Sequence, residues 1–340
     1  MTQIAPIVLV TGINGFLGSH TVEALLSHGY RVRGTHQHSH DPQCLLRNRP
    51  SWNGKVEMIH IPDHRVPNAY DEVIQGVDYV IHVAAEVHSN GETPGIDPHH
   101  TLAVSIKGTE NALNAALKEP KVKRFVYISS DAALKGPKNY NGDGYVFTEK
   151  DWNPLSLQDA EASNDEGLNY TVCKKLGEQT VHKFQTIHKP HFQVIALNPP
   201  LILGPVFHLE SVKHLSFSAW FFWQLINGRY ENAPKTEFYN YVDVRDLAKA
   251  EVLSLTADTK EPRVIICAGD LDNDKIVNAI ITRFPQFQEK IAKPNGLPST
   301  CDYQIDASLS KSALGLQYRP HEETFYDTAE SLYRLSGFVE

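Results

Sequence analysis

Cysteine is scarce in this chain of 340 residues, and long apolar runs are missing. No stretch approaches the ~18 apolar residues of a membrane span, and the opening apolar run at 4–10 lacks the basic flank of a signal peptide. The cysteines lie far apart without a Cys-x-x-Cys spacing, so they indicate neither a disulfide framework nor a zinc motif; they are Cys44, Cys173, Cys267 and Cys301. The sequence therefore predicts a soluble protein of a reducing compartment, which we expect to be the cytoplasm.

Positive charge is also in short supply. The chain has 32 Lys and Arg against 40 Asp and Glu, a net charge of -8, and no local basic cluster. This balance argues against a nucleic-acid surface and favours a small-molecule partner. The 17 histidines are scattered without a helical pair of the metalloenzyme type, so we expect no metal site. The sequence does not distinguish a monomer from a homodimer.

The first twenty residues carry a dinucleotide-binding pattern. An apolar run at 7–10 predicts a strand buried on both faces, and glycines 12, 15 and 18 separate it from an apolar-periodic helix. Glycines in this place allow a tight turn, let backbone N–H groups approach a pyrophosphate, and let the helix pack on the strand. We expect the cofactor contacts here to be Gly12, Asn14, Gly15, Phe16, Leu17 and Gly18.

Strands and helices alternate through the first 200 residues. Further buried strands are predicted at 30–35, 56–61, 79–83, 125–128 and 193–197, with helices at 101–117 and from about 169 to 188. This alternation is typical of an α/β Rossmann fold with a doubly wound parallel sheet. We expect a dinucleotide-binding domain at 1–200, to which 237–268 returns, and a smaller C-terminal substrate-binding region at 201–236 and 269–340. The segment 135–165 is rich in Gly, Pro, Asn and Asp, which predicts a long binding loop or lid.

A phenol and an ammonium lie four residues apart on the second of these helices. At this spacing Tyr170 and Lys174 share one helix face. A tyrosine pKa near ~10 suits neutral-pH catalysis poorly, and a neighbouring Lys⁺ favours the phenolate and lowers that value. Ser130 closes the strand at 125–128, at the sheet edge where ligands bind, and can donate to a substrate carbonyl. Each feature alone also occurs by chance, whereas together they predict a catalytic site.

The end of the second predicted strand bears on the choice of cofactor. An Asp or Glu there would accept from the ribose 2′-hydroxyl of NAD and repel a 2′-phosphate, and residues 35–40 contain neither. We therefore predict a moderate preference for NADPH. Neutral donors and one folded-back arginine could hold the phosphate, namely Thr35, Gln37 and Arg47, with His36 or His38 strengthening the preference at low pH. Further cofactor contacts are expected after later strands, at Asp63, Ala84, Ala85, Pro199 and Ile202.

Aromatic residues crowd the predicted helix at 217–223. Such crowding is core packing more often than a pocket wall. As a wall, it would suit an apolar aldehyde or ketone and would offer few of the donors that a sugar needs.

Taken together, these motifs resemble the extended short-chain dehydrogenase/reductase superfamily, within it the fungal NADPH-dependent aldehyde/ketone reductases related to dihydroflavonol reductase. The likeness covers nearly the whole chain and rests on Thr11-Gly12-x-x-Gly15-x-x-Gly18, Ser130, Tyr170-x-x-x-Lys174, Lys175-x-x-x-Glu178, Asn198-Pro199 and Tyr241-Val242-Asp243-Val244-Arg245-Asp246. It implies that Ser130 and Tyr170 hold the substrate carbonyl oxygen and that Tyr170 donates the proton. It also implies that Lys174 contacts the nicotinamide ribose and that Pro199 shapes the nicotinamide pocket.

The chain departs from the family pattern at two positions. Ser105 stands where many relatives carry an Asn with a proton-relay role, and Gln37 stands where the carbonyl reductases place an Arg. Nucleotide-sugar epimerases and dehydratases share this fold and the triad of Ser130, Tyr170 and Lys174. The dehydratases carry a Thr-Asp-Glu run at the position where this chain has Ser130-Asp131-Ala132, so the second acid is missing here. A non-catalytic dinucleotide sensor would not need the triad. We therefore predict an oxidoreductase that reduces an aldehyde or ketone to an alcohol by hydride transfer.

Overall fold

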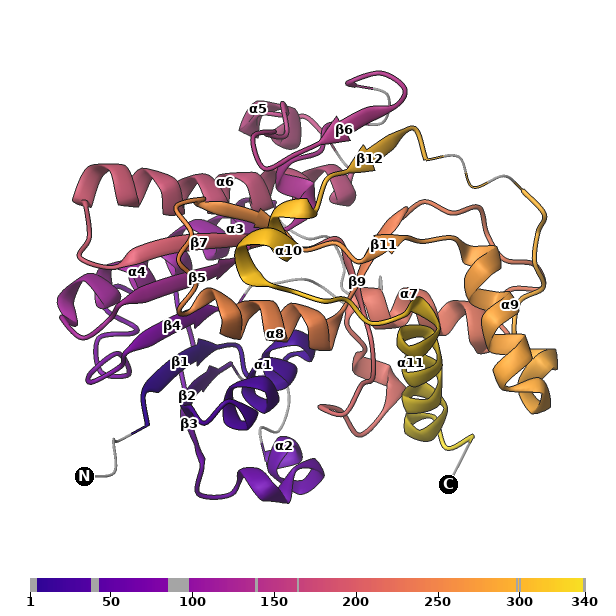
Figure 1. Cartoon of the computed structure of the whole chain (residues 1–340), viewed down its shortest axis with the longest axis horizontal. Helices are drawn as coiled ribbons and strands as arrows, with labels where there is room; N and C mark the ends of the chain where they lie inside the picture. Colours follow the sequence, from indigo (N-terminus) through magenta and orange to yellow (C-terminus); the bar gives the residue numbers. More distant parts are fainter. Residues whose placement is uncertain are drawn as a thin grey trace.

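The computed structural model describes residues 5–37, 43–84, 98–137, 140–163, 165–297, 299 and 301–338. Its main element is a parallel seven-stranded sheet in the order β10-β7-β5-β4-β1-β2-β3, seen from top to bottom on the left of Figure 1. The strands are β1 (Ile7–Thr11), β2 (Arg31–His36), β3 (Val56–His60), β4 (Tyr79–His82), β5 (Arg124–Ile128), β7 (Gln193–Asn198) and β10 (Arg263–Ile265). The predicted doubly wound Rossmann fold is confirmed.

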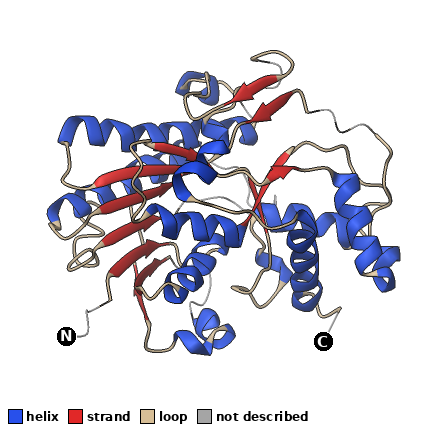
Figure 2. Cartoon of the chain, in the orientation of Figure 1, coloured by secondary structure: helices blue, strands red, loops and turns tan. Residues whose placement is uncertain are grey.

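Helices cover both faces of this sheet (Figure 2). Val8 and Val10 of β1 belong to one hydrophobic cluster, and Leu9 between them belongs to the other. Successive side chains of a strand point to opposite faces, so a strand covered on both sides must be apolar throughout. The helices on the Val8 side are α1 (Phe16–Ser27), α8 (Val244–Ser254) and α10 (Ser308–Leu314); those on the Leu9 side are α4 (Thr109–Lys118) and α6 (Glu166–His188), with α3 (Pro98–Ala103) beside α6.

A smaller second layer lies beyond the carboxyl ends of the strands, on the right of Figure 1. It contains a three-stranded sheet of β8 (Leu201–Leu203), β9 (Asn240–Asp243) and β11 (Gly269–Asp270), with helices α7 (Phe217–Ile226), α9 (Asn273–Arg283) and α11 (His321–Leu335). The sequence analysis predicted no strand at 201–203, so β8 was missed. Strand β8 pairs with β9, which is distant in the sequence, so no pattern among neighbouring residues predicts that contact.

The aromatic residues of α7 are divided between buried and half-buried positions. Phe222 is fully buried, and Trp223 is 8% exposed and packs on Tyr333. Phe217 and Phe221 both lie edge-on to Phe238. The predicted helix is confirmed, and Phe222 and Trp223 pack in the core. The rings of Phe217, Trp220 and Phe221 are half-buried, so the apolar pocket wall stays a prediction.

The segment expected to be a loop at 135–165 contains regular structure. It includes β6 (Tyr145–Phe147) and α5 (Leu157–Glu161), which begins with a capping box between Ser156 and Asp159. Strand β6 pairs with β12 (Tyr303–Ile305), forming a two-stranded sheet at the top of Figure 1. Because this pairing spans much of the chain, composition alone indicated a loop there.

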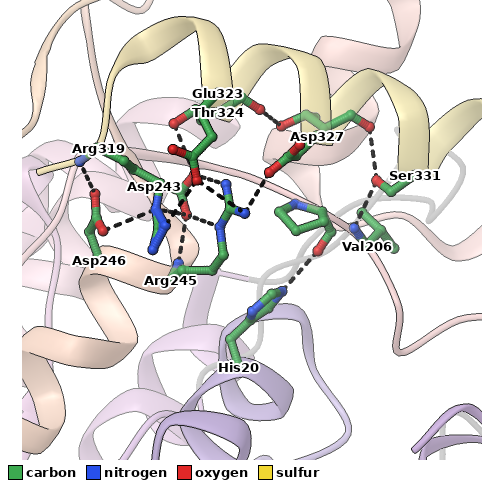
Figure 3. Close-up of polar contacts among 12 residues, drawn as sticks. His20, Val206, Asp243, Arg245, Asp246, Arg319, Glu323, Thr324, Asp327 and Ser331 are labelled. Atoms are coloured by element: carbon green, nitrogen blue, oxygen red, sulfur yellow. Dashed lines mark hydrogen bonds and ion pairs between the residues drawn. The ribbon is translucent and has the colours of Figure 1, made fainter.

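A charged cluster at the start of α8 fastens α11 to the rest of the protein (Figure 3). Asp243 is fully buried and caps α8 by accepting from the Arg245 backbone N–H at 2.8 Å. The Arg245 guanidinium binds the same carboxylate and reaches Asp327 of α11 at 2.5 Å, while Thr324 of α11 donates to Asp243 at 2.9 Å. Burial alone would raise the pKa of Asp243, but the hydrogen bonds and charge of Arg245 outweigh it and lower that pKa.

We expect Arg245→Met to lower the free energy of unfolding by about 3 kcal/mol, because removing one partner of a buried ion pair costs ~3–5 kcal/mol. The lower end applies since Arg319 remains 3.7 Å from Asp243. Urea unfolding at neutral pH measures this loss. Arg334→Met, which breaks an exposed pair with Glu330, is the control and should cost less than about 1 kcal/mol. Equal losses in the two variants would contradict the assigned role of the cluster.

Candidate active site

The turn after β1 forms a cradle of backbone groups. The N–H groups of Gly12 and Ile13 donate to the Thr35 carbonyl at 2.9 and 3.0 Å, and Gly12 has a φ of 72°. A Cβ at Gly18 would lie 2.1 Å from the Gly12 carbonyl oxygen, so only glycine lets α1 pack this closely on the turn. Helix α1 begins after Gly15 without a side-chain cap, which leaves its first N–H groups for an anion.

This cradle lies beside the end of β4, where the strand order reverses. The Ala84 N–H donates to the Thr11 hydroxyl at 2.9 Å, and a Cβ on Gly12 would lie 3.2 Å from the Ala84 Cα. The Thr11 hydroxyl also contacts His82 at 3.1 Å, and burial lowers the pKa of His82 to about 3. Doubly wound sheets bind ligands at such a switch point. The predicted contact at Ala85 lies outside the described residues.

Several residues expected to contact the cofactor beyond β2 and β3 already have partners. Arg47 makes two hydrogen bonds to Glu210, the shorter at 2.6 Å, so a phosphate contact would require this pair to open. Asp63 is bound by Arg65, whose hydrogen bonds lower the pKa of Asp63 to about 2. Gln37 donates to the Pro62 carbonyl at 3.2 Å and accepts from Asn14 at 3.5 Å. The side chain of His38 lies outside the described residues.

Helix α6 brings the predicted triad together at the carboxyl edge of the sheet. The Lys174 ammonium lies 5.8 Å from the centre of the Tyr170 ring. Burial raises the pKa of Tyr170 to about 12, a hydrogen bond with Ser130 acts in the opposite direction, and the charge of Asp131 adds to the rise. Burial lowers the pKa of Lys174 to about 8. The expectation that Lys174 lowers the pKa of Tyr170 is therefore wrong for this state of the protein, in which burial dominates.

A fully buried carboxylate one turn beyond Lys174 joins the parts of this site. Glu178 accepts from the Ser129 hydroxyl at 2.5 Å, from the Asn198 amide at 2.7 Å and from the Arg263 guanidinium at 2.5 Å. Burial acts to raise the pKa of Glu178, but a hydrogen bond with His182, the charge and hydrogen bond of Arg263 and the Ser129 hydroxyl together lower it, so the group stays ionised. The sequence analysis used Glu178 only as part of a family motif and did not predict this role.

The Glu178 network connects α6 to three strand ends. Ser129 follows β5, Asn198 ends β7 and Arg263 begins β10. The Asn198 amide also donates to the Ser130 carbonyl at 3.1 Å, and the Asp131 N–H donates to the Pro199 carbonyl at 2.9 Å. The network therefore fixes Ser130 relative to the helix that carries Tyr170. Ile202 lies on β8, opposite Val242 of β9.

The helix predicted at 101–117 is interrupted by a π-helical turn, η2 (Val104–Gly108), between α3 and α4. The hydroxyl of Ser105 in this turn donates to the Cys173 carbonyl of α6 at 3.3 Å. A Cβ at Gly177 would lie 2.4 Å from that hydroxyl, so Gly177 permits the close approach. π-Turns occur frequently at functional sites. Ser105 thus supports the backbone beside Lys174, a contact that the spacing of apolar residues did not predict.

Two other kinds of feature are absent from the described residues. Within them, no group of three or more His, Cys, Asp or Glu side chains could hold a metal ion. No helix in the same ranges is both long and apolar enough to cross a membrane.

Comparisons with known proteins agree with this geometry. The family model described as the NAD dependent epimerase/dehydratase family matches residues 8–268. The chain belongs to this family. It is 63% identical over 336 residues to a Schizosaccharomyces pombe protein described as an uncharacterized oxidoreductase, covering 99% of this chain and 100% of that protein.

Two further members of the family have named activities. Aldehyde reductase 2 of Sporidiobolus salmonicolor is 36% identical over 251 residues, 70% of each chain. The crystal structure of the yeast methylglyoxal/isovaleraldehyde reductase Gre2 complexed with NADPH superimposes with a TM-score of 0.84 at 25% identity, covering 98% of this chain and 100% of that one. The resemblance stated from the motifs is confirmed.

We expect the affinity for the dinucleotide cofactor to fall as the pH rises through about 8, the pKa of Lys174. Because burial lowers this pKa, the ammonium is lost above that pH and a charged donor to the ribose becomes a neutral one. The loss should be about fivefold, the difference between charged and neutral hydrogen bonds. Fluorescence titration across this pH range measures it. Lys174→Arg, which stays charged, should remove the effect, and an unchanged pH dependence in that variant would rule Lys174 out as its source.

Proposed function

We propose that the protein reduces an aldehyde or ketone to an alcohol with NADPH, with Tyr170 as the proton donor. The observation that carries this proposal is the contact of Tyr170 with Ser130 at the carboxyl edge of the sheet, with Lys174 on the same helix face. The named activities of the relatives, an aldehyde reductase and a methylglyoxal/isovaleraldehyde reductase with NADPH, support it.

The residues present fit a nicotinamide dinucleotide. The uncapped N–H groups at the start of α1 suit the pyrophosphate, and the turn at Gly12 brings them close to the end of β4. We expect Lys174 to contact the nicotinamide ribose and Pro199 and Ile202 to shape the nicotinamide pocket. When bound, NADPH supplies the hydride. We propose that 1–200 with 237–268 holds it, that 201–236 and 269–340 cover the substrate, and that the enzyme acts in the cytoplasm.

The protonation state of Tyr170 suits reduction. With its pKa raised to about 12, Tyr170 is a neutral phenol near pH 7 and holds the proton that a developing alkoxide needs. An alkoxide is a stronger base than a phenolate, so this transfer is favourable. Ser130 can donate a second hydrogen bond to the same oxygen and stabilise the charge before the proton arrives.

The alternative of a nucleotide-sugar dehydratase receives less support from the site. Ala132 stands where the dehydratases carry a second acidic residue. The first, Asp131, is paired with Lys135 at 2.5 Å. A non-catalytic sensor would have no use for Tyr170, Ser130 and Lys174 together.

Tyr170→Phe keeps the ring and removes the proton donor. We expect turnover to fall by ~10²–10⁴-fold, the usual contribution of a general acid, with cofactor affinity little changed. Consumption of NADPH with isovaleraldehyde measures turnover. Tyr333→Phe is the matched control, because Tyr333 is also buried but belongs to α11. A Tyr170→Phe variant that kept more than about a tenth of wild-type turnover would exclude Tyr170 as the donor.

NADPH should be preferred over NADH moderately. Residues 35–40 contain no acid that would repel a 2′-phosphate, and Arg47, the arginine expected to bind one, is paired with Glu210. Gln37→Glu should reverse the preference by adding an acceptor for the 2′-hydroxyl and a charge that repels phosphate. The ratio of kcat/KM for the two cofactors measures this. Gln317→Glu adds the same charge at an exposed position and should leave the ratio unchanged. A wild-type preference for NADH would contradict the cofactor assignment.

A further inference from the structure

A cavity separate from the candidate active site lies where the edge strand β10 of the main sheet leads into the second layer. Its volume is about 610 Å³, within the range of ~300–1,000 Å³ that is usual for small-molecule sites. It is lined by residues of α10 and β11 and of the end of β12, which lie near the middle of Figure 1. The lining residues include no member of the triad and none of the turn at Gly12. The reductase function proposed above therefore gives this cavity no role.

The part of the wall formed by α10 supplies hydrogen-bond donors. Ser308, Lys311 and Ser312 line the cavity, and their spacing of three and four residues puts them on one helix face. Lys311 is exposed, and it makes neither an ion pair nor a hydrogen bond with the described residues. Its ammonium lies 5.9 Å from the centre of the Tyr318 ring. An ammonium without a carboxylate partner, beside hydroxyl groups, suits the carboxylate of a ligand.

The part of the wall formed by β9 and β11 supplies hydrogen-bond acceptors. Asn240 of β9 is 4% exposed, and its Nδ2 donates to one carboxylate oxygen of Asp270 on β11 at 3.2 Å. This bond fixes the orientation of the amide, because an ionised carboxylate only accepts. The Asn240 Oδ1 is then left without a hydrogen-bond partner among the described residues. A buried acceptor of this kind calls for a donor, and the charge of Asp270 favours an ammonium as that donor.

The other lining residues are largely apolar, and they include Cys267, Ala268, Ile305 and Ala307. Asp306 also lines the cavity, and one of its oxygens accepts from the Ser308 N–H at 2.9 Å. The carboxylates of Asp270 and Asp306 outnumber the ammonium of Lys311, so a purely anionic ligand is disfavoured. A ligand that matches every part of the wall has an ammonium, a carboxylate and an apolar chain.

We propose that this cavity binds a small amino acid with an apolar side chain. Lys311 and Ser308 hold its carboxylate, and Asn240 and Asp270 hold its ammonium. The inference goes beyond the proposed reductase function and does not depend on it, because binding here involves neither the cofactor cradle nor the triad. The competing explanation is a cleft that holds only solvent.

The test uses three probes that share one apolar chain. Norleucine carries both charges, pentylamine lacks the carboxylate, and hexanoate lacks the ammonium. Isothermal titration calorimetry with the full chain measures the Kd of each probe for the wild type, Lys311→Met and Asp270→Asn. Both positions are exposed, so we expect these variants to fold. Lys249→Met and Asp258→Asn are the matched controls, because they remove the same charges from exposed positions that do not line the cavity.

We expect norleucine to bind more tightly than pentylamine, and hexanoate to bind most weakly. Lys311→Met should weaken norleucine binding about tenfold without weakening pentylamine binding, the size expected for a hydrogen bond to a charged group. Asp270→Asn should weaken norleucine and pentylamine binding about tenfold each without weakening hexanoate binding. The two controls should leave every Kd unchanged.

Two results would overturn the proposal. One is the absence of saturable norleucine binding in the millimolar range, which would leave the cavity a solvent-filled cleft. The other is a norleucine Kd that stays the same in Lys311→Met and Asp270→Asn, which would place the bound amino acid elsewhere on the protein. Because the calorimetry measures no turnover, neither result bears on the proposed reductase function.

Discussion

The ionised carboxylate of Glu178 holds the candidate site together. It is fully buried, and an isolated charge there would be costly, but it accepts hydrogen bonds from a hydroxyl, an amide and a guanidinium. Each donor belongs to a different strand end, and the carboxylate itself belongs to α6. The guanidinium of Arg263 continues the chain of contacts, since it stacks on Trp152 and donates to the carbonyls of Glu149 and Asp151. Misplacement of any one element would leave a buried polar group unpaired.

Burial of this region also sets its acid–base chemistry. The same exclusion of water raises the pKa of Tyr170 to about 12 and lowers that of Lys174 to about 8, because both shifts favour the uncharged form. A neutral phenol is the form that gives a proton to an alkoxide. The charge of Asp131 pushes the pKa of Tyr170 in the same direction. Burial and this charge thus keep Tyr170 protonated at neutral pH.

The sequence predicted those features that follow from local patterns. Short apolar runs located most strands of the main sheet, and glycine spacing located the turn at Gly12. The four-residue spacing placed Tyr170 and Lys174 on one helix face. Three features escaped prediction because they depend on contacts between distant segments. Strand β8 exists through its pairing with β9, the π-turn at Ser105 is held against Cys173, and the role of Glu178 needs Arg263. No window of neighbouring residues contains these pairs.

The difference between local patterns and contacts of distant segments also separates the cofactor-binding half of the site from the substrate-binding half. A phosphate is bound by backbone N–H groups, so a short glycine motif followed by a helix is sufficient, and such a motif can be read from one stretch of sequence. A substrate is recognised by side chains that must converge from several elements. Here Ser130 follows β5 and Tyr170 lies on α6. Their relative position depends on Glu178, which binds Ser129 and Asn198 across segments far apart in the sequence, so this half of the site cannot be read from one stretch of residues.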